Sequence, residues 1–224
     1  MSRTAHLYNL GTVDYREAWD LQRTLAEAVG EGSAPDSVLL LEHPPTVTLG
    51  RRAEPGELHV PDDVQVDVVE VDRGGKSTYH GPGQLVCYPI LDLKRHGQDV
   101  RRYCRDLEDA LIRTIRAFDV EATRIEGLTG VWLDAPPRKI ASIGIHLTKW
   151  ISTHGYALNV DLDPAPFTQW ITACGLDGYQ FTSLERERGS RVTVNDVRPV
   201  AAATLGEVFD LVFEEREAPL LATR

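Results

Sequence analysis

Cysteine is scarce in this chain, and long apolar runs are missing. The 224 residues include three cysteines, Cys87, Cys104 and Cys174, an odd number with no C-x-x-C spacing. This count argues against both a disulfide framework and a zinc site. No apolar run approaches the length of a membrane span, and the first residues lack the apolar core of a signal peptide. We therefore expect a cytoplasmic protein that does not associate with a membrane.

An excess of positive charge is also missing. The formal net charge of −10 argues against a general affinity for nucleic acid. Basic residues nevertheless gather in the central part of the chain: Arg51, Arg52, Arg73, Lys76, Lys94, Arg95, Arg101, Arg102, Arg105, Arg138 and Lys139. Most of them are expected to be solvated side chains. The alternative is a basic face that receives an acidic partner.

What the chain has in abundance is glycine within one short stretch. Residues 73–84 read RGGKSTYHGPGQ, with four glycines and a proline between two strand-like runs. Glycine at this density indicates that the backbone adopts positive φ angles or approaches another group closely. The polar residues between the glycines are suited to binding a substrate. The stretch is therefore interpreted as a binding loop.

The same stretch contains a false nucleotide-binding signal. Gly75-Lys76-Ser77 resembles the end of a P-loop, but the first glycine of that motif would fall on Glu70. A P-loop also requires a helix immediately after it, whose N-terminus binds phosphate. The following sequence His-Gly-Pro-Gly cannot begin a helix. A nucleotide P-loop is therefore rejected.

The remaining pattern predicts an α+β protein. A capping box at Asp14 to Glu17 begins a helix with an apolar stripe that ends at Gly30. A second helix spans about 100–118, with Asp99 as its N-cap and Cys104 on its core face. Strands are expected at 37–43, 46–50, 64–72, 85–90, 130–133, 139–148 and 154–160. A short helix is expected within 164–174. This order favours a mixed or antiparallel sheet flanked by helices.

The chain is expected to form a single domain over residues 1–224. Residues 193–224 are predicted to be a C-terminal helical appendage, with a turn at Asn195-Asp196 and a helix from about 199 to 214.

Cys174 and Lys139 are the candidate catalytic pair. A lone cysteine is usually a small buried apolar residue, and that alternative is open for Cys174. A thiol just before the helix-ending Gly175 also faces the negative end of a helix dipole, so a thiolate there needs a cation or a base nearby. Lys139 opens a strand of otherwise apolar residues and is the best candidate for both roles. Its alternative is a solvated charge at a strand end.

The histidines indicate binding loops rather than a metal site. His80 lies inside the glycine stretch, His154-Gly155 leads into a strand, and His43 precedes a rigid Pro-Pro turn. They share no ligand spacing such as H-x-x-x-H, so no metal is expected.

Several longer motifs follow one another along the chain: LEHPP at 41–45, LGR at 49–51, the glycine stretch 73–84 with Tyr88-Pro89, GVW at 130–132, RKIASIG at 138–144, HGYALN at 154–159, Cys174-Gly175 and TSL at 182–184. In these motifs and their order the chain resembles one known family, the octanoyltransferases of lipoate biosynthesis. The resemblance runs from about residue 12 to 197. It departs at Ala173, where many relatives are expected to have proline.

The resemblance implies a fold like the catalytic domain of biotin protein ligases and lipoate ligases. It implies transfer of an octanoyl group from acyl carrier protein to a lysine of lipoyl domains, in the E2 subunits of 2-oxoacid dehydrogenases and in the glycine cleavage H protein. It implies no cofactor, and we expect a monomer. Cys174 would carry the acyl group as a thioester, and Lys139 would lower the pKa of that thiol and act as general acid and base.

The resemblance also assigns the substrate-binding residues. They are Arg73, Gly74, Gly75, Lys76, Ser77, Thr78, Tyr79, His80, Ser142, Ile143, Gly144, Gly155, Tyr156 and Ala157. Thioester exchange needs a thiolate and no energy source, which agrees with the absence of an ATP motif.

Four alternatives are open. An ATP-dependent lipoate or biotin ligase of the same fold would act on free octanoate with ATP. An amidotransferase would move octanoyl between lipoyl domains. A non-catalytic acyl-protein binding module would keep its function without Cys174. A cysteine hydrolase would release free fatty acid.

Overall fold

The computed structural model describes residues 2–134, 136–172 and 179–217. Its first half contains β1 (Arg3–Thr12), α1 (Tyr15–Glu31), β2 (Ser37–Glu42), β3 (Thr46–Leu49), β4 (Asp67–Glu70), β5 (Ser77–His80), β6 (Gln84–Ile90), the 3-10 helix η1 (Leu93–His96) and α2 (Val100–Arg116). Its second half contains β7 (Thr123–Ile125), β8 (Leu128–Leu133), β9 (Arg138–Thr148), β10 (Ile151–Asn159), α3 (Pro166–Gln169), β11 (Gln180–Phe181), α4 (Leu184–Arg188), α5 (Val194–Phe209) and β12 (Leu211–Glu215).

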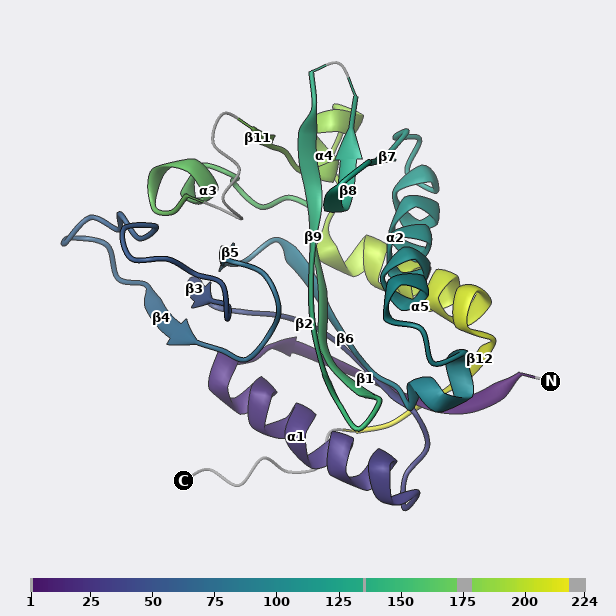
Figure 1. Ribbon diagram of the computed structural model, residues 1–224. Helices are drawn as coiled ribbons and strands as arrows, with labels where there is room; N and C mark the ends of the chain where they lie inside the picture. Colours follow the sequence, from purple (N-terminus) through teal and green to yellow (C-terminus); the bar gives the residue numbers. More distant parts are fainter. Residues whose placement is uncertain (1, 135, 173–178, 218–224) are drawn as a thin grey trace.

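Two sheets organise the chain. The large one has the strand order β12-β1-β2-β6-β10-β9-β8-β7, with β11 paired to β9. It is mixed, because β1 runs parallel to both β12 and β2 whereas β6, β10, β9 and β8 pair antiparallel. The small sheet has the order β4-β3-β5. The predicted α+β class with a mixed sheet flanked by helices is confirmed (Figure 1).

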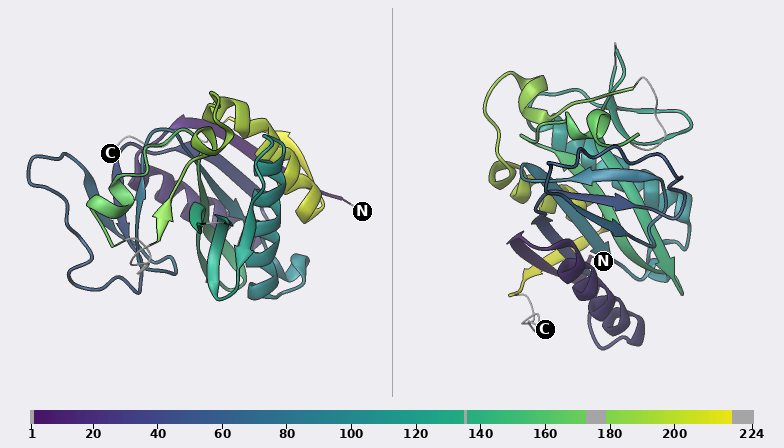
Figure 2. Two further views of the ribbon diagram at one scale, coloured as in Figure 1. Left: turned by 90° about the horizontal axis from the view of Figure 1, so that it is seen from above. Right: turned by 90° about the vertical axis from the view of Figure 1, so that its left-hand side faces the viewer.

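Both faces of the large sheet are covered. Helices α2 and α5 lie together on one face, and α1 lies on the other (Figures 1 and 2). Strand β2 shows how the sequence achieves this, because Val38 and Leu40 pack in the core beneath α2 and α5 whereas Leu39 and Leu41 pack beneath α1. Side chains alternate between faces along a strand, so a strand buried on both faces is apolar throughout.

Several predicted boundaries are wrong for identifiable reasons. Helix α1 continues past Gly30 and ends at Gly32, whose left-handed conformation (φ 74°) lets its N–H donate to the carbonyls of Ala28 and Val29. The glycine stretch 73–84 is not loop throughout, since residues 77–80 form β5 against β3. Cys104 is half-buried rather than part of the core face, which Tyr103 and Leu107 occupy.

The predicted helical appendage is wrong in two respects. A capping box between Thr193 and Asp196 begins α5 at Val194, ahead of the predicted start, and the helix buries Val197, Ala201 and Leu205 in the main core. Residues 211–215 are strand β12, not helix, and pair with β1.

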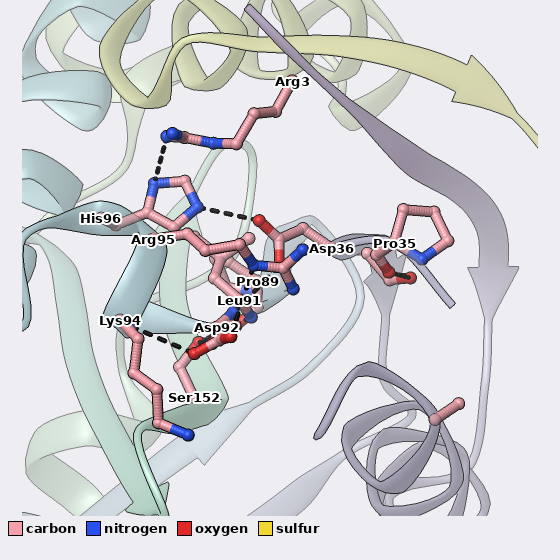
Figure 3. Close-up of polar contacts among 12 residues, drawn as sticks. Arg3, Pro35, Asp36, Pro89, Leu91, Asp92, Lys94, Arg95, His96 and Ser152 are labelled. Carbon is pink, nitrogen blue, oxygen red and sulfur yellow. Dashed lines mark hydrogen bonds and ion pairs between the residues drawn. The ribbon is translucent and has the colours of Figure 1, made fainter. Parts of the chain in front are cut away.

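The buried carboxylate of Asp36, just before β2, is bound by residues of η1 and its flank, and through His96 it is linked to Arg3 of β1 (Figure 3). Asp36 is 2% exposed and accepts hydrogen bonds from the Asp92 N–H at 3.0 Å, Arg95 Nη2 at 3.1 Å and His96 Nε2 at 2.8 Å. Arg3 Nη2 in turn donates to His96 Nδ1 at 3.1 Å. A buried acid with this many donors fixes the elements that supply them.

Among the described helices, none combines the length and the apolar composition needed to cross a membrane.

Candidate active site

A cavity of about 240 Å³ lies where the small sheet meets strands β9 and β10. We name it the Lys139 cavity. Its lining residues are Tyr15, Arg52, Arg73, Gly75, Lys76, Thr78, His80, Tyr88, Gly127, Leu128, Thr129, Trp132, Lys139, Ser142, Ile143, Gly144, His154, Gly155, Tyr156 and Ala157. Segments distant in sequence, from α1 to β10, therefore contribute to one concave surface, as is usual for ligand sites.

Most of the sequence-predicted site residues line this cavity. Three of the fourteen predicted substrate-binding residues do not: Gly74, Ser77 and Tyr79. Alternation along β5 explains two of them, because Thr78 and His80 face the cavity and their neighbours face the other way. Tyr79 packs instead against Phe167 and Trp170. The Gly74 N–H donates to the carbonyl of Ile145 at 2.9 Å and so holds the glycine stretch against β9.

Lys139 is a buried cation of the site. It is the second residue of β9 and only 4% exposed, so the predicted alternative of a solvated strand-end charge is wrong. Its Nζ lies 5.1 Å from the centroid of the Trp132 ring, within the range of a cation–π contact. Trp132 is itself fully buried in the adjacent strand β8.

Arg73 is a structural cation as well as a lining residue. Its guanidinium is buried and donates to the carbonyls of Thr48 and Lys76, both at 2.8 Å, and to the Thr48 hydroxyl at 2.6 Å. These charge-assisted hydrogen bonds connect β3, which contains Thr48, to the residue just before β5. Arg73 therefore fixes the entry to β5.

The central basic residues divide among several hollows and ion pairs. Of the central basic residues, only Arg52, Arg73, Lys76 and Lys139 line the cavity. Arg95 and Arg102 line a different hollow, and Arg138 forms a two-point ion pair with Glu187.

Hydrogen-bonded rings form one wall of the cavity. His154 Nε2 lies 2.7 Å from Asp72 Oδ1, and the Tyr15 hydroxyl lies 3.4 Å from His154 Nδ1. Burial lowers the pKa of His154 despite its bond to Asp72, and the same bond lowers the pKa of Asp72. Burial raises the pKa of Tyr15 to about 12, so its hydroxyl stays protonated and can donate.

His43 extends this wall beneath the cavity. Its Nδ1 lies 2.7 Å from the carbonyl of Val13, so that nitrogen carries the proton and Nε2 accepts from the Tyr88 hydroxyl at 2.7 Å. Burial lowers the pKa of His43 to about 4. The imidazole is therefore neutral at physiological pH.

His80 is also held in one tautomer. Its Nδ1 donates to Gln84 Oε1 at 2.8 Å, while Gln84 Nε2 donates to Asn159 Oδ1 at 2.9 Å and Asn159 Nδ2 donates to the Thr182 carbonyl at 2.9 Å. This direction leaves His80 Nε2 as a hydrogen-bond acceptor. Burial holds the pKa of His80 well below its ordinary value. His80 is thus a buried residue that lines the cavity, whereas the sequence placed it in an open loop.

Cys174 lies outside the described residues, so only its flanks are placed. On one side, Thr172 donates its N–H to the Glu57 carbonyl at 2.9 Å, and the Thr172 carbonyl oxygen lies 3.2 Å from Ser77 Oγ. On the other side, the Tyr179 ring lies 5.4 Å from the ring of Trp132. The flanks are thus held by β5 and β8, two elements that line the Lys139 cavity.

Ser77 and Lys76 are bound to a buried acid that the sequence did not single out. Glu57 Oε2 accepts from Ser77 Oγ at 2.8 Å, and Lys76 Nζ lies 3.0 Å from Glu57 Oε1. Burial raises the pKa of Glu57, but the hydrogen bonds from Ser77 and Lys76 outweigh it and hold that pKa below its ordinary value. Glu57 therefore connects β5 to the backbone at Thr172.

The sequence also missed Tyr15, Arg52 and residues 127–129, at the start of β8, as lining residues. Tyr15 carries no sequence signal beyond its place in a capping box, whereas Tyr88 and Trp132 stood within the recognised motifs. In the described part of the chain, no group of three or more His, Cys, Asp or Glu residues could hold a metal ion.

Comparison with solved structures identifies the fold class. The structure of the bipartite lipoate protein ligase from Thermoplasma acidophilum superposes with a TM-score of 0.77 at 16% identity, over 98% of this chain and 89% of that one. Biotin protein ligase from Aquifex aeolicus superposes with a TM-score of 0.58 at 13% identity, over 91% of this chain and 70% of that one. The fold is that of the lipoate and biotin protein ligases, as the resemblance implied.

Sequence comparison identifies the family. Residues 14–206 match the lipoyl protein ligase A/B catalytic domain. Octanoyltransferases from Roseiflexus sp. (strain RS-1) and Mycobacterium ulcerans are 46% and 44% identical, over 93% and 94% of this chain and 89% and 90% of their own lengths. The chain belongs to the octanoyltransferases of this family and is an acyltransferase.

Proposed function

We propose that this chain transfers an octanoyl group from acyl carrier protein to a lysine of lipoyl domains, through a thioester on Cys174. The acceptors are the lipoyl domains of 2-oxoacid dehydrogenase E2 subunits and the glycine cleavage H protein. The observation that supports the proposal is the Lys139 cavity, which combines a buried cation with apolar walls and is lined by β5 and β8, the two strands that the flanks of Cys174 contact.

The first half-reaction is a thioester exchange. The Cys174 thiolate attacks the carbonyl carbon of the octanoyl donor, the new bond from that carbon to Sγ forms, and the bond to the donor sulfur breaks. The leaving thiolate takes a proton from the Lys139 ammonium, which leaves a neutral amine. A cation beside the nucleophile favours the thiolate before attack. The buried position of Lys139 strengthens this electrostatic effect because water screens it less.

The second half-reaction forms the amide. The ε-amine of the acceptor lysine attacks the thioester carbon, the bond from that carbon to Sγ breaks, and an amide forms. The Lys139 amine takes the proton that the attacking nitrogen loses, which restores the ammonium. Because each proton that Lys139 gives in the first step returns in the second, the cycle needs no cofactor.

The walls of the cavity suit an acyl chain next to a polar head. Leu128, Ile143 and Ala157 provide apolar surface, and Arg52 and Lys76 lie among the lining residues. Aliphatic chains are bound by burial of apolar area, while a few polar groups fix orientation.

We also propose that the protein is cytoplasmic and monomeric. Cell fractionation tests the location, and sedimentation of the purified protein tests the monomeric state.

The intermediate can be tested directly by intact mass. The protein is incubated with octanoyl-acyl carrier protein without ATP, weighed, digested and mapped, with Cys174→Ser as the matched variant. We expect one octanoyl adduct on Cys174 that hydroxylamine removes, and none on the variant. An unmodified Cys174 in protein that transfers octanoyl would contradict the thioester route. Transfer from free octanoate that requires ATP would favour ligase chemistry instead.

A further inference from the structure

The ammonium end of Lys139 packs against the backbone of Gly130 as well as near the ring of Trp132. Gly130 in β8 has φ +118°, which residues with a side chain rarely adopt. A Cβ at this position would lie 2.6 Å from the Ala141 carbonyl oxygen, 2.9 Å from Lys139 Cε and 3.4 Å from Lys139 Nζ. The end of the Lys139 side chain therefore lies in the space that a side chain at residue 130 would need.

The backbone of Gly130 is held by a carboxylate from α2. Glu108 is 3% exposed, and its Oε1 accepts a hydrogen bond from the Gly130 N–H at 3.1 Å. In the described pairing of β8 with its neighbours β7 and β9, Gly130 has no Cα partner, and the register between β8 and β9 shifts one residue further on. The Glu108 carboxylate therefore supplies the hydrogen-bond acceptor that a neighbouring strand supplies to other N–H groups of a sheet.

Glu108 is itself fixed on its second oxygen. Its Oε2 accepts from Arg105 Nη1 and from Arg124 Nε, both at 3.0 Å. Arg105 lies three residues earlier on the same helix, and Arg124 lies on β7. A buried carboxylate with both oxygens occupied has one orientation, so the position of the Gly130 N–H is set by α2.

We propose that Glu108 is a positioning residue for Lys139, acting through Gly130. The inference rests on the proposed catalytic role of Lys139. The ammonium lies against the Gly130 backbone and within cation–π range of the Trp132 ring, so two residues of β8 border its position. Release of the Gly130 N–H lets the backbone of β8 move and with it the surface against which Lys139 packs. A displacement of about 1 Å in a catalytic group can lower a rate by about 10²-fold.

The kinetic test compares Glu108→Ala, Glu108→Gln and Asp109→Ala. Glutamine keeps an oxygen that can accept from the Gly130 N–H, whereas alanine does not. Asp109 is the matched control, because it neighbours Glu108 and pairs with Arg124 at 3.1 Å but makes no hydrogen bond to Gly130. For Glu108→Ala we expect kcat for octanoyl transfer to fall about 10²-fold, with KM for the donor little changed. Glu108→Gln should recover most of that loss, and Asp109→Ala should behave as wild type.

A second measurement does not depend on activity. The rate at which Lys139 reacts with a small amine-reactive reagent is followed by peptide mass mapping in the same proteins. Lys139 is buried, so its labelling requires local opening. We expect labelling to accelerate about tenfold in Glu108→Ala, corresponding to looser local packing, and to stay at the wild-type rate in the other two variants. Thermal melts of all variants give the loss of global stability for comparison.

The outcomes separate the two proposals. If Lys139→Ala transfers octanoyl normally, the catalytic role of Lys139 fails, and the labelling result alone decides whether Glu108 positions it. The inference is overturned if Lys139 labelling is unchanged in Glu108→Ala. It is also overturned if Glu108→Ala and Glu108→Gln lose kcat equally and in step with their thermal stability, since that is the behaviour of a residue that only supports the fold.

Discussion

Acidification should destabilise this protein through His43. Burial lowers the pKa of His43 from 6.5 to about 4, while the unfolded chain keeps the ordinary value. Between these two values the unfolded state binds a proton that the folded state does not, so stability is present above pH 6.5 and is lost as the pH falls. Across the interval between the two pKa values, the free energy of unfolding falls by about 3 kcal/mol. About 2 kcal/mol of this is lost between pH 7 and pH 5.

The assay is urea unfolding at pH 7 and pH 5 for the wild type and His43→Gln. Glutamine has no titratable group, and its amide can still donate to the Val13 carbonyl and accept from the Tyr88 hydroxyl. Between the two pH values we expect the wild type to lose about 2 kcal/mol more than the variant. Other titrating groups, including the buried His80, are present in both proteins and cancel to first order. Equal losses in the two proteins would refute the reasoning.

Three further predictions concern catalysis and packing. Lys139→Ala should lower the rate of octanoyl transfer by about 10² to 10⁴-fold at pH 7. The rate should partly recover at pH 9, because more of the acyl-carrying thiol is ionised there. A pH profile parallel to that of wild type would exclude Lys139 from the mechanism. Asp36→Ala should cost about 3 kcal/mol in urea unfolding, because the Asp92 N–H, Arg95 Nη2 and His96 Nε2 all lose their acceptor, whereas the exposed Asp20→Ala should change little. Gly155→Ala places a Cβ 2.2 Å from the Cys87 carbonyl oxygen and should cost about 3 kcal/mol in the same assay; an unchanged midpoint would show that β6 and β10 can separate freely.

The sequence predicted the central elements because their signals are local. Asp14 and Asp99 cap α1 and α2 as expected, and the apolar runs at β2 and β6 are strands. The site residues were predicted from motifs, and most of those residues line one cavity. Family resemblance preserves the set of residues around a site even where each residue alone carries little information.

The errors have a different origin. Strand β5 was taken for loop because the four residues 77–80 lie among glycines, and only pairing with β3 makes them a strand. Strand β12 was taken for helix because residues 211–215 continue a helical pattern, whereas pairing with β1 decides the outcome. Glu57 and Glu108 were not singled out, because a buried acid is recognised only by the donors that the fold brings to it.

The pairing of β1 with β12 also determines how the chain must fold. Arg3 is aligned with Leu211, so this contact spans almost the whole sequence. Contacts of such separation form late, because the closure of a long loop must precede them. During synthesis, β1 can pair with β2 early, but its other edge stays unpaired until β12 has left the ribosome. An unpaired strand edge is a template for intermolecular pairing. Truncation before residue 211 should therefore yield a protein that aggregates, even though every cavity residue is still present.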